Sequence, residues 1–361
     1  WKSKNSLNVY IITITILLVV FTLLNPKLVW SSFSILLANL FISILIISNI
    51  PILDFSRKFY NIIYCLCFFS LFRYLFLIFD IHFALPEFKS IALDNYDNFI
   101  VFGIVNFTGN SFVNGTGSII DLYRNNGLWW EPGAFQIFIN IAFLCGIYTG
   151  LIDRKAYILF MVTMFSTLST TGIVVFAISS SLYFKDKGLN IFLMLILFFI
   201  GFLLLDFYFG ISDLLFSKFN SESSTFVSFD SRRADFLIDF EIFKQNPFLG
   251  AGFGNLNERE VYTNIFFNSN SGASGTGSNG VSILFCYLGV IALLILLPII
   301  ISILSFNNSL YSNFLYVIVF FILFSSENFS TIIIFYLIYM YSLQYFFSKI
   351  KITIKNRNSN P

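Results

Sequence analysis

The sequence predicts an all-α polytopic membrane protein, and three observations lead to this prediction. Of 361 residues, 57% are hydrophobic and only 11% are charged, whereas a soluble globular protein has about 25% charged residues. The apolar residues, which include 50 phenylalanines, are gathered in blocks of about 17–25 residues, the length with which an α-helix crosses a hydrocarbon core. Polar sequence is concentrated in two long stretches between these blocks. We therefore expect one integral membrane domain over residues 1–361.

Each apolar block predicts a membrane-spanning helix. The blocks are 8–25, 28–50, 59–80, 128–150, 156–184, 189–209, 280–304, 311–327 and 329–348. The block 156–184 is interrupted by STLSTTG, and we predict a hairpin of two short helices that turns at Thr170–Gly172. Arms this short must pack against protein rather than lipid. The hairpin brings the total to about ten transmembrane helices.

Positive charge in short loops predicts the orientation of these helices. Lysine and arginine are enriched in cytoplasmic loops, and here they occur as Lys2/Lys4, Arg57/Lys58, Arg154/Lys155, Lys185/Lys187 and a basic C-terminal tail. Only the hairpin lets all of these lie on the cytoplasmic side. The polar stretches 81–127 and 210–279 then become two outer-face, periplasmic loops. Without the hairpin they would lie on opposite faces.

Composition also argues against several functions. A net charge of +2 gives no reason to expect a nucleic-acid partner, and a single histidine, His82, excludes a histidine metal cluster. The four cysteines lie in apolar segments, where cysteine is usually a small hydrophobe. No internal repeat is visible, which weakens a transporter interpretation, because many transporter folds are built from repeats.

The second polar stretch predicts a short amphipathic helix over 231–245. Asp230 or Ser231 can cap its start, and Asn246–Pro247 ends it, since the residue before proline is disfavoured in a helix. Its apolar residues at helical spacing are Phe236, Leu237, Phe240 and Phe243.

Arg232 and Arg233 lie in the first turn of this predicted helix. One interpretation is a local salt bridge, from Arg232 to Asp235 or from Arg233 to Glu222. The other is a phosphate clamp, because a guanidinium group binds phosphate oxygens in a bidentate manner.

Glycine-rich sequence follows the helix. Gly250, Gly252 and Gly254 alternate in NPFLGAGFGN, a pattern that permits tight turns or the close approach of a ligand. It follows a helix stop and differs from a dinucleotide-binding loop, which has another spacing and follows a strand. A second glycine-rich piece, SGASGTGSNG, leads through Asn279 into the next span.

Four more charged residues lie near the predicted membrane surface: Arg73, Arg124, Glu131 and Glu327. Ionisable residues at membrane depth are costly and usually face a cavity or a partner. Simpler interpretations are an interfacial carboxylate beside Trp129 and Trp130 for Glu131, and snorkelling or pairing with Asp80 for Arg73. On the predicted topology these residues, with Arg232 and Arg233, fall towards the outer face. Such a set suits binding of a lipid-linked pyrophosphate and activation of a nearby hydroxyl group.

Several ordered motifs resemble one family. RNNGLWWEPGAF (124–135) is similar to the Arg-x-x-Gly…Glu-Pro-Gly signature of bacterial O-antigen polymerases. SRRADFLIDFEIFKQNPFLGAGFGN resembles the arginine-led helix and Pro-hydrophobic-Leu-Gly-x-Gly-x-Gly segment of the wider O-antigen polymerase/ligase family, with the family arginine at Arg232. SNGVSILFCYLGV is similar to its His-Asn segment, but Ser278 stands where the ligases carry histidine. The match covers residues 124 to 300.

The resemblance implies a GT-C-like glycosyltransferase in the bacterial inner membrane, with its site facing the periplasm. Its substrate would be an undecaprenyl-pyrophosphate-linked oligosaccharide, without a cofactor, and a chain-length regulator is a further partner to consider. It implies catalytic roles for Arg232 and for Glu131 or Glu327. It implies substrate binding by Arg73, Arg124, Arg233, Gly250, Gly252 and Asn279. The alternatives are an O-antigen ligase, which Ser278 disfavours, and a lipid-linked oligosaccharide flippase.

Overall fold

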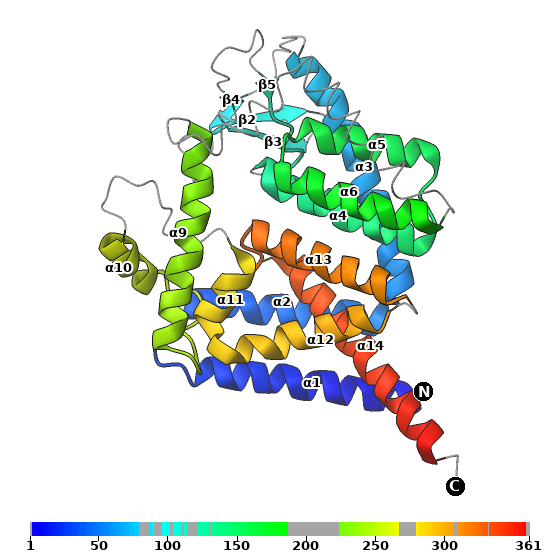
Figure 1. Cartoon of the computed structure of the whole chain (residues 1–361), viewed down its shortest axis with the longest axis vertical. Coiled ribbons are helices and arrows are strands. Elements are labelled where there is room, and N and C mark those ends of the chain that lie inside the picture. The colour runs from blue at the N-terminus through cyan, green and yellow to red at the C-terminus, as the bar shows by residue number, and fades with distance from the viewer. Residues whose placement is uncertain are drawn as a thin grey trace. The chain divides into compact units, whose positions relative to one another are not determined.

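The structure is a computed structural model, and most of its elements are helices (Figure 1). It describes residues 2–78, 87–89, 96–101, 104–109, 112–113, 122–129, 131–186, 224–266, 279–306, 309–330 and 332–358. The chain divides into two compact units, a first unit of Trp1–Ile52 with Val227–Pro361 and a second unit of Leu53–Phe226. Each unit is described by itself. The predicted single membrane domain stays a prediction.

The first unit contains both the N-terminal and the C-terminal part of the chain. Its elements are α1 (Lys2–Leu23), α2 (Trp30–Asn49), α9 (Ser224–Gln245), α10 (Leu256–Phe266), α11 (Gly280–Leu288), the 3-10 turn η2 (Gly289–Ala292), α12 (Leu293–Leu304), α13 (Leu310–Ser326) and α14 (Ile333–Asn358). Helix α14 packs against α1, α2 and α12. It buries Tyr336, Tyr339 and Met340 completely, so the C-terminal helix lies at the centre of this unit.

The second unit has a core of aromatic side chains. Its helices are α3 (Ile52–Ile78), α4 (Pro132–Thr149), α5 (Arg154–Ser166) and α6 (Thr170–Asp186). Phe135, Phe143, Phe160 and Phe176 are fully buried in one cluster, to which α3 contributes Tyr60. Aromatic rings supply much of the apolar area that holds such a core together.

Helices α5 and α6 form the predicted hairpin. The ring of Tyr157, near the start of α5, stacks on that of Tyr183, near the end of α6, with 5.6 Å between centroids. The Tyr183 hydroxyl donates to the Ile152 carbonyl oxygen at 3.3 Å. The open ends of the hairpin, with Arg154 and Lys185, therefore lie together, and the hairpin is confirmed.

The turn of this hairpin lies slightly earlier than predicted, at 167–169. Leu168 takes a positive φ of 49° there, and the Ser169 hydroxyl accepts from the Gly172 backbone N–H at 3.4 Å. Serine is a favoured helix cap, so Thr170–Gly172 become the first turn of α6 rather than the bend. The cytoplasmic placement of the basic ends stays a prediction.

The first polar stretch requires a correction to the all-α prediction, because it contains short β-strands. They are β1 (Glu87–Lys89), β2 (Tyr96–Val101), β3 (Ile104–Gly109), β4 (Phe112–Val113) and β5 (Leu122–Tyr123). An antiparallel sheet has the order β1-β2-β3, with Tyr96 opposite Gly109, and β4 pairs with β5. Aromatic and β-branched residues in β2 and β3 favour strands, a signal that the prediction of a polar loop did not use.

Among the residues that the structure describes, three helical segments are long and apolar enough to cross a membrane: Trp30–Asn49, Pro132–Thr149 and Gly280–Leu304. Shorter apolar helices occur at Tyr10–Leu23, Thr170–Lys185 and Leu310–Ser326. This is the composition of a helical membrane protein, as the sequence predicts. The total of about ten spans and the GT-C-like architecture stay predictions, and the block 189–209 lies outside the described residues.

Helix α9 differs from the predicted helix 231–245 at its start. It begins at Ser224 and ends at Gln245, so Asp230 and Ser231 lie inside the helix and are not its cap. Local propensity is a weak guide where packing supports a longer helix. The predicted end before Asn246–Pro247 is correct.

The glycine segment after α9 packs against other parts of the first unit. Gly250 has a φ of +67°, and a Cβ atom there would lie 2.5 Å from the Tyr287 carbonyl oxygen. Gly252 has a φ of +96°, and its Cβ would lie 2.6 Å from the Lys27 carbonyl oxygen. The Asn25 amide donates to the Leu249 and Gly250 carbonyls at 2.8 and 3.0 Å. These glycines therefore have a packing role, and their predicted part in substrate binding stays a prediction.

We predict that Gly250→Ala lowers stability far more than Gly150→Ala. The two glycines share a positive φ, but a Cβ at Gly150 would meet nothing within 4 Å. Gly150→Ala should cost only the backbone strain of about 1–2 kcal/mol, whereas Gly250→Ala adds an overpacking cost of about 1–3 kcal/mol. Thermal unfolding of both variants in detergent measures the difference. Equal losses of stability in the two variants would show that the close approach of Gly250 to the Tyr287 backbone is unimportant.

Candidate functional site

Helix α9 turns two carboxylates, Asp235 and Asp239, towards the interior of the first unit. Arg232, Asp235 and Asp239 follow one another at intervals of three and four residues, so they share one face of the helix. Asp235 is 0% exposed and Asp239 is 1% exposed. Carboxylates this deeply buried need ionic or hydrogen-bonding partners.

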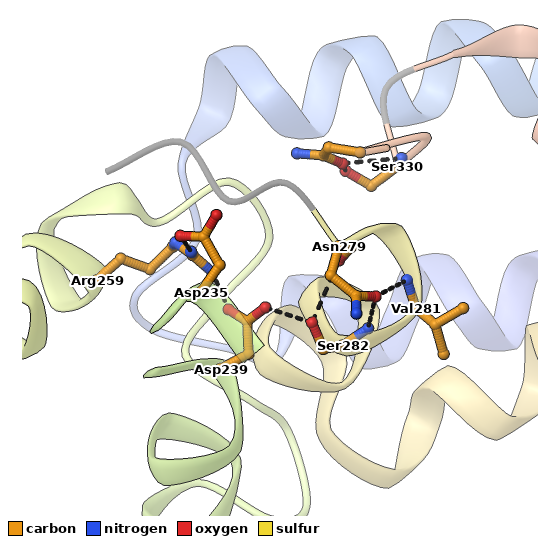
Figure 2. Close-up of polar contacts among 8 residues, drawn as sticks. Asp235, Asp239, Arg259, Asn279, Val281, Ser282 and Ser330 are labelled. Atoms are coloured by element: carbon orange, nitrogen blue, oxygen red, sulfur yellow. Dashed lines mark hydrogen bonds and ion pairs between the residues drawn. The ribbon is translucent and has the colours of Figure 1, made fainter. Parts of the chain in front are cut away.

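Arg259, on α10, supplies the charge that these carboxylates need. Its side chain is fully buried, and one guanidinium nitrogen contacts Asp235 Oδ1 at 2.8 Å. Another contacts Asp239 Oδ1, and Figure 2 shows Arg259 between the two carboxylates. One arginine thus links α10 to two successive turns of α9.

A third helix joins this network through Ser282 on α11. The Ser282 hydroxyl donates to Asp239 Oδ2 at 2.6 Å (Figure 2), a short distance typical of hydrogen bonds to a charged acceptor. Asn279 caps the same helix, because its side-chain oxygen accepts from the backbone N–H groups of Val281 and Ser282, at 3.1 Å each. Asn279 therefore has a structural role, and its predicted contact with substrate stays a prediction.

Arg232 pairs with Glu327. A guanidinium nitrogen of Arg232 lies 3.0 Å from Glu327 Oε1, and the two side chains are 38% and 11% exposed. Glu327 is the C-cap residue of α13, directly after the last helical residue. The contact joins one nitrogen to one oxygen, so it leaves much of the exposed guanidinium fork facing outward.

The start of α11 lies beside Glu327. A Cβ atom on Gly280 would be 2.5 Å from the backbone carbonyl oxygens of both Phe324 and Glu327. Only glycine allows the two backbones to approach so closely. The N-terminal end of α11 carries partial positive charge and the C-terminal end of α13 carries partial negative charge, so Arg232 is the group here that favours an anion. We call Arg232, Glu327, Asn279 and Gly280 the α9–α11 site.

The hypothesis of local salt bridges is wrong for Arg232. Arg232 pairs with Glu327, which is 95 residues away, and Asp235 pairs with Arg259. Arg233 is exposed on the other side of α9. Its hypothetical partner Glu222 lies outside the described residues.

The remaining predicted residues belong to the second unit. Arg124 donates from Nε to the Thr167 carbonyl oxygen at 3.1 Å, which ties it to the turn of the α5–α6 hairpin. Glu131 is the N-cap residue of α4, and Pro132 occupies the first helical position. Proline is favoured at this first helical position. A carboxylate at this end of a helix is favoured by the helix dipole.

Arg73 lies on α3 and is partly buried. Its predicted partner Asp80 lies outside the described residues, as does Trp130. The structure thus brings together Arg232, Glu327 and the start of α11, and it holds Arg124, Glu131 and Arg73 in the other unit. A single site that combines both sets of residues stays a prediction.

Sequence reasoning missed Arg259, Asp239 and Ser282. The spacing of Asp235 and Asp239, four residues apart beside Arg232, was a signal that α9 has a charged inward face. Nothing local points to Arg259, which lies 20 residues beyond Asp239. Within the described part of the chain, no group of three or more histidine, cysteine, aspartate or glutamate side chains could hold a metal ion.

We predict that Arg259→Met strongly destabilises the protein, because it leaves two buried carboxylates without their cation. Breaking a buried ion pair costs about 3–5 kcal/mol. Lys27→Met is the matched control, since Lys27 pairs with Glu258 while 47% exposed, and exposed pairs contribute about 0–1 kcal/mol. Thermal unfolding in detergent measures both, and a small effect of Arg259→Met would contradict the proposed importance of the network.

A scan against protein-family models and searches of curated proteins and of solved structures found no match for this chain.

Proposed function

We propose that this chain is an O-antigen polymerase, a membrane glycosyltransferase that joins undecaprenyl-pyrophosphate-linked repeat units at the periplasmic face. The observation that carries the proposal is the Arg232–Glu327 pair, at 3.0 Å. Arg232 occupies the position of the arginine in the family that the chain resembles. Its partner, Glu327, is one of the two carboxylates expected to act with it. The order of the motifs from 124 to 300 gives further support.

The proposed reaction transfers a glycan chain from its lipid carrier to an acceptor sugar. The acceptor hydroxyl oxygen forms a bond to the anomeric carbon of the donor glycan. The bond between that carbon and the pyrophosphate oxygen breaks, and undecaprenyl pyrophosphate leaves with the bonding electrons. The hydroxyl proton passes to a carboxylate, either Glu327 or Glu131. Such proton transfer typically contributes about 10²–10⁴-fold to the rate.

Arg232 would stabilise the charge that grows on the leaving pyrophosphate. Preorganised cations aimed at developing charge are often the largest catalytic contribution. The exposed part of its guanidinium group can bind a phosphate in a bidentate manner.

Glu327 would act as the counterion of Arg232 when no substrate is bound. A pyrophosphate that contacts Arg232 competes with this carboxylate for the same donors. Its arrival would release Glu327 from the pair while the carboxylate remains next to the site. The released oxygen can then accept the proton of the incoming hydroxyl group.

Polymerisation is favoured over ligation by one residue. Ser278 stands where the ligases that the chain resembles carry histidine, and this position lies outside the described residues. The base in the proposed reaction is therefore a carboxylate. A flippase is disfavoured by the gathering of charged residues towards one predicted face.

We predict that Arg232→Ala abolishes chain extension while the protein still inserts into the membrane. Loss of one group that stabilises developing charge lowers the rate about 10²–10³-fold. Arg232→Lys should retain more activity, although lysine lacks the bidentate fork. The measurement is the ladder of lipopolysaccharide lengths in a strain that lacks the chromosomal gene and carries each variant.

Arg57→Ala is the control, because Arg57 is exposed and predicted to face the cytoplasm. The deletion strain itself should make lipopolysaccharide capped with a single repeat unit. Loss of every repeat unit would indicate a ligase or flippase instead. Full-length ladders from Arg232→Ala would remove this residue from the site.

We also predict that Glu327→Gln binds inorganic pyrophosphate more tightly than the unmodified protein and is less active. Glutamine is neutral, so it competes less with an anion for Arg232 and cannot serve as a base. Calorimetric titration of the purified protein in nanodiscs measures the affinity. Weaker or unchanged binding by Glu327→Gln would contradict the exchange of counterions.

A further inference from the structure

The outer face of α9 carries large apolar side chains, while its inner face holds both buried carboxylates and buried apolar residues. Phe236, Leu237 and Phe240 are 49%, 45% and 46% exposed, and the rings of Phe236 and Phe240 stack at 6.4 Å. Phe248, just beyond the helix, is 75% exposed. In contrast, Asp235 and Asp239 point inward and are fully buried.

The exposed face is more apolar than that of a typical helix in contact with water, although Ala234, Ile238 and Ile242 also lie buried on the inner face. A surface helix in an aqueous loop buries its apolar stripe and exposes its charges. Burial of apolar area is the main favourable contribution to folding, so a face with three adjacent large apolar side chains is stable only where its surroundings are also apolar. The sequence predicts an amphipathic helix, and the structure places Phe236, Leu237 and Phe240 on its exposed face.

The exposed stripe has a cation near each end. Arg233 is exposed one turn before Leu237. Lys244 is exposed one turn after Phe240, and its Nζ lies 4.6 Å from the centre of the Phe240 ring and 2.6 Å from Glu241 Oε1. Basic residues that flank an apolar stripe are typical of helices that lie in the interface of a membrane with anionic lipids. Long basic side chains can extend to the headgroups while their stems cover apolar surface.

We propose that the outer face of α9, consisting of Arg233, Phe236, Leu237, Phe240, Lys244 and Phe248, contacts the lipid bilayer. The aromatic and leucine side chains meet the acyl chains, and Arg233 and Lys244 meet anionic headgroups. The same unit contains Trp30–Asn49 and Gly280–Leu304, which are long and apolar enough to cross a membrane. Phe41 on the first of these segments is 63% exposed, as expected of a side chain that faces lipid. Helix α9 is then a membrane-associated element rather than part of an aqueous loop.

Photocrosslinking tests this proposal independently of activity. Phe240 is replaced by p-benzoylphenylalanine, which retains an aromatic ring at that position. The full-length protein is placed in nanodiscs of phosphatidylethanolamine and phosphatidylglycerol with alkyne-tagged acyl chains. After irradiation, the tag reports lipid attached to the protein. The same substitution at Phe41 is the positive control. The same substitution at Glu260, an exposed polar position on α10, gives the yield expected away from lipid.

We expect lipid adducts at position 240 in an amount similar to that at position 41 and greater than that at position 260. A yield at position 240 no greater than at position 260, with a strong signal at position 41, would overturn the proposal. Crosslinked dimers instead of lipid adducts would show that a second copy covers this face, and would overturn it equally. Elution of each variant as one symmetric size-exclusion peak establishes that it is folded.

Discussion

Burial of the Arg259 guanidinium between two carboxylates is the interaction on which the polar side of the first unit depends. Ions removed from water lose hydration that only close and well-directed partners can replace. Asp235 and Asp239 provide such partners, with a contact of 2.8 Å to Asp235. Because Asp239 also accepts from Ser282, α9, α10 and α11 are held in one arrangement. Loss of the arginine would leave negative charge that no apolar packing could accommodate.

This arrangement places the residues of the proposed reaction. With the inward face of α9 fixed by Asp235 and Asp239, Arg232 one turn earlier reaches Glu327 at the end of α13. Gly280 brings the start of α11 against the same end of α13. The same constraint turns Phe236, Leu237 and Phe240 outward. The buried carboxylates and the exposed apolar side chains are thus two consequences of one helix orientation, and both suit the proposed enzyme, whose substrate would be anchored in a membrane by an isoprenoid chain.

Local sequence signals predicted the features that local physics determines. Long apolar blocks predicted the long apolar helices, paired basic residues predicted the α5–α6 hairpin, and Asn246–Pro247 predicted a helix end. Features that depend on distant partners were not predictable in this way. Arg259 pairs with Asp235, 24 residues away in the chain, and Glu327 pairs with Arg232, 95 residues away. The orientation of α9 was not predictable either, because periodicity shows that one face is apolar, but not whether that face meets protein or lipid.

The most direct test of the central claim is polymerisation by the purified protein alone. The chain would be reconstituted into liposomes that contain one undecaprenyl-pyrophosphate-linked repeat unit, and its products would be separated by length. We expect a ladder of lipid-linked glycans that grows with time, together with release of one undecaprenyl pyrophosphate for each bond formed. Unchanged single repeat units, from protein that is folded and inserted, would contradict the account.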